Sequence, residues 1–206
     1  MKCLIVTPYL PNRLEYVIGD GKFDAVICAD ASADLAISAG LFPDEIIGDF
    51  DHGDKPISEN VVCVPCEKDD TDTMLCIKRA LSLGADEIFI AGGLGGRLDH
   101  TVANLQSLAF AEKNGVRATI SDGDNEAFLI TKSARVKRRD GYYFSLFAYG
   151  SACRDIYASG VKYPLCGGTL DTYFPLGVSN EITDDFADVK VGEGTLLAVF
   201  SRKEQI

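Results

Sequence analysis

The sequence lacks tryptophan and contains only two histidines, His52 and His100, among its 206 residues. Positive charge is also scarce, because 20 Lys and Arg stand against 31 Asp and Glu, a formal net charge of −11 at pH 7. Nucleic-acid phosphates and anionic membrane surfaces attract basic proteins, so this charge disfavours both as partners. A polyanionic substrate would have to be met by bound cations or by a local basic site.

No apolar run is long enough to cross a membrane. The first apolar stretch, residues 3–6, is far shorter than the roughly 20 residues of a membrane span or the apolar region of an export signal. Seven cysteines, an odd number, are scattered through a chain that is large enough to fold without disulfides. Cys63 and Cys66 form a single C-x-x-C pair, which alone does not predict a zinc site. We therefore expect free thiols and a cytoplasmic protein.

Strand and helix patterns alternate in the first part of the chain. Short apolar runs predict buried strands at residues 2–7, 24–29, 61–64, 87–91 and 116–121. Apolar residues at helical spacing predict one helix through Met74, Ile77 and Leu81 and another through Val102, Leu105 and Leu108. Such alternation is typical of an α/β domain with a mainly parallel sheet flanked by helices, which we place at residues 1–132.

The pattern changes after about Ser133. Residues 142–149 predict a strand, and further short strand-like runs follow without a visible helix. Segments 166–169 and 191–195 are typical of hairpin turns. We therefore expect a second domain of antiparallel strands at residues 133–206. A basic run at the junction is interpreted as a solvated strand or linker face; it comprises Lys132, Arg135, Lys137, Arg138 and Arg139.

Acidic residues follow several of the predicted strands. In an open α/β sheet, ligands bind beyond the carboxyl ends of the strands, so residues at these ends are the ones to inspect. Asp30 follows one strand, Asp49 and Asp51 follow another, and Asp72 and Asp99 come after later ones. Carboxylates gathered at one edge repel one another unless a cation is bound, and hard oxygen ligands suit Mg²⁺. Taken singly, Asp72 and Asp99 have an equally good explanation as helix-capping residues.

Between a predicted strand and a predicted helix lie four glycines in five residues: Gly92, Gly93, Gly95 and Gly96. Such a loop lets the backbone approach a phosphate beside a helix N-terminus, although a flexible turn explains it equally well. It matches neither the dinucleotide-binding fingerprint nor the P-loop. Arg97, which follows, could form a fork to phosphate oxygens. His100 is either a ligand contact or a residue satisfied by hydrogen bonds at the helix start.

Nucleophilic catalysis has no support in the sequence. There is no G-x-S-x-G elbow, and the histidines and cysteines have no spacing that singles out a Cys–His pair. The residues by themselves thus predict a magnesium-dependent enzyme that acts on a phosphorylated ligand, with a nucleotide favoured. They leave the acceptor open.

The order and spacing of these motifs resemble the thiamine pyrophosphokinase family over nearly the whole chain. The matching segments are 29–34, 43–44, 48–51, 69–72, 92–100 with Asn104, and 179–181. The resemblance implies an N-terminal α/β domain that holds ATP, a C-terminal antiparallel β-sandwich domain, and a homodimer whose thiamine sites lie between subunits. It also implies transfer of diphosphate from ATP to the thiamine hydroxyl, with AMP as the leaving group.

The resemblance also implies roles for individual residues. Those that would hold Mg²⁺ and the triphosphate, as catalytic residues, are Asp49, Asp51, Asp72 and Asp99. The ATP site would further include Asp30, Gly92, Gly93, Gly95, Gly96, Arg97, His100 and Asn104. Ser179 and Asn180 would bind the thiamine pyrimidine.

Two positions depart from the family pattern, since Asp34 stands where Asn is common and His52 where Ser is common. Without tryptophan, the aromatic wall that animal members place against thiamine must come from Tyr, Phe or an aliphatic residue. One alternative is another enzyme on this scaffold, such as a pyrophosphokinase for a pterin alcohol or a metal-dependent phosphohydrolase. A second is a non-catalytic nucleotide- or thiamine-binding protein, which the many like charges disfavour.

Overall fold

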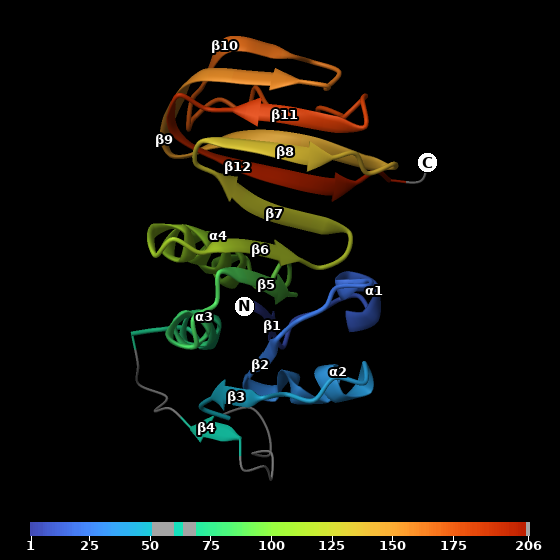
Figure 1. Cartoon of the computed structure of the whole chain (residues 1–206), viewed down its shortest axis with the longest axis vertical. Coiled ribbons are helices and arrows are strands. Elements are labelled where there is room, and N and C mark those ends of the chain that lie inside the picture. The colour runs from blue at the N-terminus through green and yellow to red at the C-terminus, as the bar shows by residue number, and fades with distance from the viewer. Residues whose placement is uncertain (51–59, 64–68, 205–206) are drawn as a thin grey trace. The chain divides into compact units, whose positions relative to one another are not determined.

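The computed structural model describes residues 1–50, 60–63 and 69–204, and the chain divides into two compact units, Met1–Gly123 and Asp124–Ile206 (Figure 1). The division lies upstream of the boundary that we expected after residue 132. Strand β7 (Asn125–Ile130) pairs with β12 (Glu193–Arg202), and this pairing places β7 in the second unit.

The first unit is built on parallel strands. They are β1 (Lys2–Val6), β2 (Ala25–Ala29), β3 (Glu45–Gly48), β4 (Val61–Cys63), β5 (Glu87–Ala91) and β6 (Arg117–Ser121). Their order across the sheet is β4-β3-β2-β1-β5-β6, and every neighbouring pair in this order is parallel. The short apolar runs of the sequence therefore mark strands that are hydrogen-bonded to parallel neighbours, and β1 and β2 are almost wholly buried.

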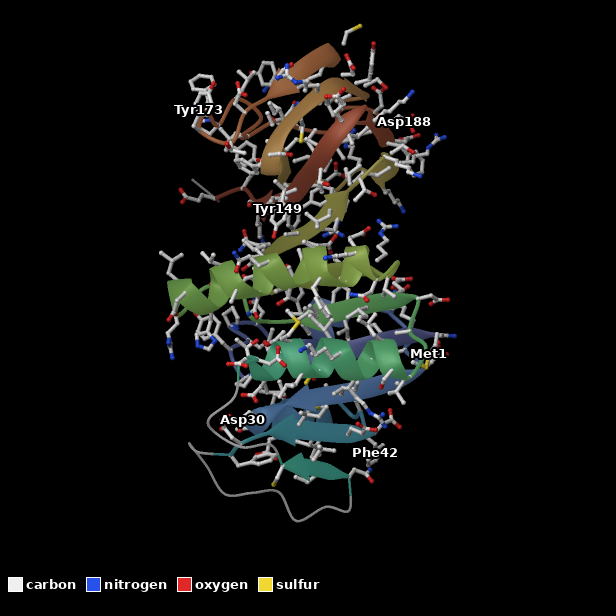
Figure 2. The ribbon with its side chains drawn as sticks, turned by 90° about the vertical axis from the view of Figure 1, so that its left-hand side faces the viewer. Met1, Asp30, Phe42, Tyr149, Tyr173 and Asp188 are labelled. Atoms are coloured by element: carbon white, nitrogen blue, oxygen red, sulfur yellow. The ribbon has the colours of Figure 1, made fainter. Side chains whose placement is uncertain are left out.

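The helices of this unit are α1 (Leu14–Ile18), η1 (Asp30–Ser32, a 3₁₀ turn), α2 (Ala33–Ser38), α3 (Asp72–Ser82) and α4 (Leu98–Lys113). Successive residues of a strand point to opposite faces of a sheet. On one face, Leu4 and Val6 of β1 belong to the same apolar cluster as Leu14 of α1 and Ala36 of α2. Figures 1 and 2 show α3 and α4 along the opposite face.

The starts of α3 and α4 differ from expectation. Thr71 is the N-cap of α3, and its hydroxyl accepts the Met74 N–H at 3.2 Å, so Asp72 occupies the first helical position instead of capping the helix. Helix α4 begins after Arg97 without a side-chain cap, and Asp99 lies within its first turn. Both carboxylates still face the positive end of a helix dipole, where negative charge is favourable.

The second unit consists of strands. In addition to β7 and β12, they are β8 (Ser133–Lys137), β9 (Tyr142–Ser159), β10 (Leu165–Leu170) and β11 (Phe186–Lys190). All pairings are antiparallel: β12 pairs with β7 and with the first half of β9, while the second half of β9 pairs with β10 and β11. Strand β8 pairs with β11, so four residues of the basic run at the domain junction lie in or next to a strand: Lys132, Arg135, Lys137 and Arg138. The expected strand-rich C-terminal domain is confirmed.

Both expected hairpin turns are wrong. Residues 166–169 lie inside β10, where the register against β9 shifts at Cys166/Gly168 and at Gly168/Leu170. The glycines therefore accompany strand irregularities, a common use of glycine within strands. Residues 191–192 connect β11 to β12 and residues 193–195 begin β12, but β11 pairs with β8 and β9 whereas β12 pairs with β7 and β9. The segment is a connection between strands that are not hairpin partners.

The described cysteines are free thiols, as expected. Cys3 and Cys28 are buried in the first unit, and burial raises the pKa of each thiol to about 12, so both stay protonated at neutral pH. Cys66 lies outside the described residues. Within the ranges that the structure describes, no helix combines the length and the apolar character needed to cross a bilayer.

Candidate functional site

A pocket of about 420 Å³ opens in the first unit at the carboxyl ends of its parallel strands. Its lining comes from segments at or after the ends of β1, β2, β3 and β5, from the start of α3 and from the first two turns of α4. In Figure 2, Asp30 of this lining lies at the opposite end of the strands from Met1. Ligands of open parallel α/β sheets bind at this edge, so the pocket stands where the sheet topology predicts a site.

Three of the predicted acidic residues, Asp30, Asp49 and Asp72, line this pocket. Asp51 lies outside the described residues. Asp99 is turned to Arg97 and is not part of the lining. Within residues 1–50, 60–63 and 69–204, no three side chains of His, Cys, Asp or Glu are grouped closely enough to hold a metal ion.

Arg97 and Asp99 form a two-bond ion pair on the surface. Arg97 Nε donates to Asp99 Oδ1 at 3.2 Å and Nη2 donates to Oδ2 at 2.6 Å. Hydrogen bonding from Arg97 holds the pKa of the Asp99 carboxyl below its ordinary value, and the same pair raises the pKa of Arg97. A phosphate that binds the guanidinium fork would therefore compete with the Asp99 carboxylate.

Asp30 combines an unusual backbone with an unpartnered oxygen. Its φ is +47°, a left-handed conformation that is uncommon outside glycine. Its Oδ1 atom is buried and has no hydrogen-bond partner in the described part of the chain. The neighbouring strand allows this arrangement because a Cβ at Gly48 would lie only 2.7 Å from Asp30 Cα. Backbone strain and unpaired buried oxygens of this kind concentrate at ligand sites.

The four predicted glycines all have positive φ. A β-carbon at Gly93 would lie 2.6 Å from Asn104 Nδ2, and one at Gly92 would lie 2.5 Å from both Thr7 Oγ1 and Tyr9 O. Glycine is thus required by the backbone conformation and by close contacts. Gly93 and Gly95 line the pocket, whereas Gly92 and Gly96 are not part of the lining.

Amide N–H groups of this loop are bound within the protein. Gly92 N–H donates to Ser121 O at 2.7 Å, Gly93 N–H to Tyr9 O at 2.8 Å, and Gly95 N–H to Thr101 Oγ1 at 3.0 Å. The loop is therefore held in one conformation by its own hydrogen bonds. The expectation that the loop turns its N–H groups to a phosphate is wrong for these three.

Asn104 and His100 play different parts at the pocket. Asn104 is 4% exposed, and its Nδ2 donates to Gly93 O at 2.9 Å, so its amide supports the glycine loop. His100 lines the pocket, and its backbone N–H donates to Asp99 Oδ1 at 2.9 Å.

Sequence reasoning missed several lining residues, among them Thr7, Pro8, Tyr9 and Thr73. Tyr9 follows β1, and the strand-end rule that selected the acidic residues would have selected this segment too. Acidic residues and glycines are the residue types that mark a binding site at the carboxyl ends of strands. Tyr9 is neither, so its position after β1 did not attract notice.

In the second unit, the predicted substrate residues lie in the segment between β10 and β11. Ser179 has φ +58°, and its N–H donates to Ser145 Oγ at 3.0 Å. The Asn180 amide is engaged at both ends, because Nδ2 donates to Tyr163 O at 2.9 Å while Oδ1 accepts from Tyr163 N–H at 3.0 Å and Glu181 N–H at 2.8 Å. Asn180 thus clamps a neighbouring backbone segment.

A smaller cavity of about 160 Å³ in this unit is lined by Leu146, Leu170, Tyr173, Phe174 and neighbouring residues. Tyr173 is 84% exposed and projects from the unit (Figure 2). Tyr163 and Phe174 are exposed as well. Exposed aromatic side chains are thus available in a chain without tryptophan.

Each of the two units contains a segment that matches a family model of known proteins. Residues 21–120 match the family model described as thiamin pyrophosphokinase, catalytic domain, and residues 132–196 match the model described as thiamin pyrophosphokinase, vitamin B1 binding domain. A thiamine pyrophosphokinase from Bacillus subtilis is 26% identical over 184 residues, which cover 85% of this chain and 86% of that relative.

Solved structures show the same fold. A crystal structure of thiamine pyrophosphokinase from Bacillus subtilis has a TM-score of 0.87 at 24% identity and covers 99% of this chain and 100% of its own. One of thiamin pyrophosphokinase from Geobacillus thermodenitrificans has a TM-score of 0.85 at 24% identity and covers 100% of this chain and 99% of its own. The fold is therefore shared along the whole chain.

Proposed function

Because the chain belongs to the thiamine pyrophosphokinase family, we propose that it transfers a diphosphate group from ATP to the hydroxyl of thiamine, with thiamine diphosphate and AMP as products. One observation carries this proposal: the catalytic-domain and vitamin-B1-binding models match in order, and the first match covers residues 21–120 of the unit that contains the strand-end pocket. A pterin pyrophosphokinase or a pure nucleotide-binding protein would leave the second match unexplained.

The pocket of the first unit is the proposed ATP site. It stands at the sheet edge where α/β folds bind nucleotides, and it is bordered by a glycine loop and by the Arg97 guanidinium. The unit Met1–Gly123 would thus form the ATP-binding catalytic domain and the unit Asp124–Ile206 the thiamine-binding domain.

The acidic lining suits Mg²⁺. Asp30, Asp49 and Asp72 offer hard carboxylate oxygens to one pocket, and the buried Asp30 Oδ1 has no hydrogen-bond partner among the described residues. We propose Asp49 and Asp72 as magnesium ligands, with Asp51 as a further ligand on the strength of the family resemblance. The bound ion would neutralise charge on the triphosphate during transfer. Asp99 is paired with Arg97 outside the lining and would have to turn toward the pocket to join these ligands.

The reaction needs alignment and charge compensation more than covalent catalysis by the protein. A bond forms between the β-phosphorus of ATP and the thiamine hydroxyl oxygen, which gives up its proton. The bond from that phosphorus to the oxygen bridging the α- and β-phosphorus breaks, and AMP leaves with that oxygen. In this chain, Arg97 would bind phosphate oxygens and the rigid loop from Gly92 to Gly96 would shape the floor of the pocket. Transfer of the γ-phosphoryl group by kinases depends on the same combination of positioning and electrostatic stabilisation.

On the thiamine side, we propose that the Ser179 side chain contacts the pyrimidine. Asn180, whose amide is bound to the Tyr163 backbone, would support this contact by fixing the segment. The family resemblance further favours a homodimer with thiamine bound between subunits, and a cytoplasmic location.

A direct assay tests the function. Purified protein is incubated with ATP, Mg²⁺ and thiamine, and nucleotides and thiamine species are separated by chromatography. Equal amounts of thiamine diphosphate and AMP are expected. Formation of ADP with thiamine monophosphate would make the protein a simple kinase, and turnover with a pterin alcohol in place of thiamine would identify a different acceptor.

Omitting Mg²⁺ in a parallel reaction tests the cation. Product formation at an undiminished rate after chelation of all divalent ions would contradict the proposed magnesium site.

A further inference from the structure

The ring of Tyr9 lies directly on the backbone of the glycine loop. A Cβ at Gly96 would be 2.8 Å from Tyr9 Cε2 and 2.9 Å from Cδ2, and a Cβ at Gly95 would be 3.2 Å from Cε1. Both glycines have left-handed backbones, with φ +63° and +83°. The ring can approach this closely only because neither residue has a side chain.

The backbone of Tyr9 is attached to the same loop at a second point. Tyr9 O accepts the Gly93 N–H at 2.8 Å, and the Thr7 hydroxyl lies 3.4 Å from the same oxygen. A hydrogen bond at Gly93 and a ring contact at Gly95 and Gly96 therefore fix the segment after β1 against the loop after β5. Tyr9 is nevertheless 48% exposed, and it lines the pocket together with Arg97 and His100.

We propose that Tyr9 is a positioning residue of the nucleotide pocket. Its ring holds the Gly95–Gly96 backbone, and with it the following Arg97, in the arrangement that receives the phosphates, while its exposed part forms a wall of the pocket. The inference rests on the proposed function, because it takes this pocket as the ATP site. Preorganisation of this kind raises affinity by lowering the cost of ordering the loop when the ligand binds.

The first unit contains a matched contact away from the pocket. Tyr16 of α1 lies on Gly123, where a Cβ would be 2.7 Å from Tyr16 Cε1 and 2.8 Å from Cδ1, and Gly123 has φ +96°. Tyr16 is 50% exposed, close to the value for Tyr9. Neither Tyr16 nor Gly123 is among the described residues that line the pocket. Substitution of Tyr16 is therefore a control, because it removes an aromatic ring that packs on a glycine but does not line the pocket.

The test measures Mg-ATP affinity by calorimetry, and the KM values for ATP and thiamine, for Tyr9→Ala, Tyr9→Phe and Tyr16→Ala. Loss of an aromatic contact is expected to raise the Kd and KM for ATP about three- to tenfold in Tyr9→Ala, with the KM for thiamine unchanged. Tyr9→Phe restores the affinity, because the ring is kept, and Tyr16→Ala leaves it unchanged. Equal ATP affinity in Tyr9→Ala and the wild type would overturn the inference.

A double-mutant cycle with Gly96→Ala sharpens the test. In the wild type, the new Cβ collides with the Tyr9 ring, whereas in the Tyr9→Ala background that collision is absent. Gly96→Ala should therefore weaken ATP binding less in the second background, and strictly additive effects would show that the ring does not act on the loop. If the wild type itself binds no Mg-ATP, the proposed function fails, and the inference fails with it; normal wild-type binding with an unaffected Tyr9→Ala removes only the role of Tyr9.

Discussion

The two units present their predicted ligand residues in opposite states. At the pocket of the first unit, Asp30 has a left-handed backbone and a buried oxygen without a hydrogen-bond partner in the described residues. In the second unit, both ends of the Asn180 amide are bound to backbone groups of Tyr163 and Glu181. Asp30 thus has a buried oxygen that no described group satisfies, whereas the polar atoms of the Asn180 amide are engaged with the backbone.

A residue's place in a sequence motif does not by itself reveal whether its side chain binds a ligand or supports the fold. Buried polar groups in proteins are normally hydrogen-bonded, so an exception points to strain, a catalytic role or a bound water or ion, whereas a fully bonded amide needs no such explanation. Asn104 resembles Asn180, because its side-chain amide is also hydrogen-bonded to the backbone, at Gly93 O. Substitutions at the two kinds of residue should therefore separate activity from stability.

The largest effect is expected at the acidic lining of the pocket. Asp72→Asn should lower kcat about 10²- to 10³-fold with the fold intact, because a group that stabilises charge in the transition state is lost. Steady-state kinetics with the circular dichroism spectrum as a check on folding would measure this. Asp70→Asn is the matched control, since Asp70 lies two residues away, binds Lys78 Nζ at 2.6 Å, and is not part of the lining. Near-normal turnover in Asp72→Asn would remove that residue from the metal site.

Asp30→Asn should lower kcat/KM for ATP about 10- to 100-fold without lowering the free energy of unfolding. A charged contact to the ligand is lost, while asparagine tolerates a left-handed backbone about as well as aspartate does. Activity and urea unfolding are measured on the same preparation. A drop in stability together with unchanged activity would show that Asp30 is structural, and the contrast between the units would disappear.

Asn180→Ala should have the reverse profile. Loss of the two bonds to Tyr163 and of the bond from Glu181 N–H is expected to lower the free energy of unfolding by about 1–2 kcal/mol. Chemical denaturation of the full-length variant and of the wild type measures this change in the free energy of unfolding. Ser179→Ala is the comparison variant, because the Ser179 bond to Ser145 uses the backbone N–H and survives the substitution. A fully stable Asn180→Ala would mean that the clamp is dispensable.

The smallest effect concerns one carboxylate in each unit. Hydrogen bonding from Arg97 lowers the pKa of Asp99, and hydrogen bonding from Lys203 and Lys162 lowers the pKa of Glu181. A carboxylate whose pKa is lower in the folded state stabilises the protein above its unfolded pKa, and this contribution is lost as the pH falls through the folded value. Stability should therefore decrease below pH 3.8 for Asp99 and below pH 4.5 for Glu181, their ordinary values.

Charge-neutral variants test this dependence. In Arg97→Gln the pKa of Asp99 should rise toward its ordinary value, and in Lys203→Gln that of Glu181 should do so, as followed by NMR titration. Unshifted titration curves in either variant would mean that the ion pair does not persist in solution.

Much of the fold could be predicted because its strands are short buried apolar runs. The run at 87–91 coincides with β5, and the helix through Ile77 ends close to Gly84 as expected. Helices α1 and α2 were not predicted, since five or six residues are too few to show a helical period. The continuation of β9 past Gly150 was missed as well, because glycine normally interrupts a strand, and here it does so only locally with φ +75°.

The part of the site that could be predicted is the part that follows from the order and direction of the parallel strands. Strand-end acids and a glycine loop could be identified because parallel strands bring their carboxyl ends to one edge. The pairing of Arg97 with Asp99 and the inward bonds of Asn104 and Asn180 depend on side-chain rotamers and tertiary contacts. No spacing rule contains that information, so the sequence assigned ligand roles to residues that the structure shows engaged elsewhere.

The pairing of β12 has a consequence for the order of events during protein synthesis. Strands of the first unit lie beside partners that are complete once residue 121 has been made, so this unit can fold on a chain still being extended. In the second unit, β7 and the first half of β9 both depend on β12, which ends at Arg202. The edges of β7 and β9 stay unpaired until β12, the last strand to be made, is available. Strand pairing over such sequence distances is slow, and unpaired strand edges are prone to aggregation. The first unit can therefore fold during synthesis, whereas the second unit can complete its sheet only after β12 has been made.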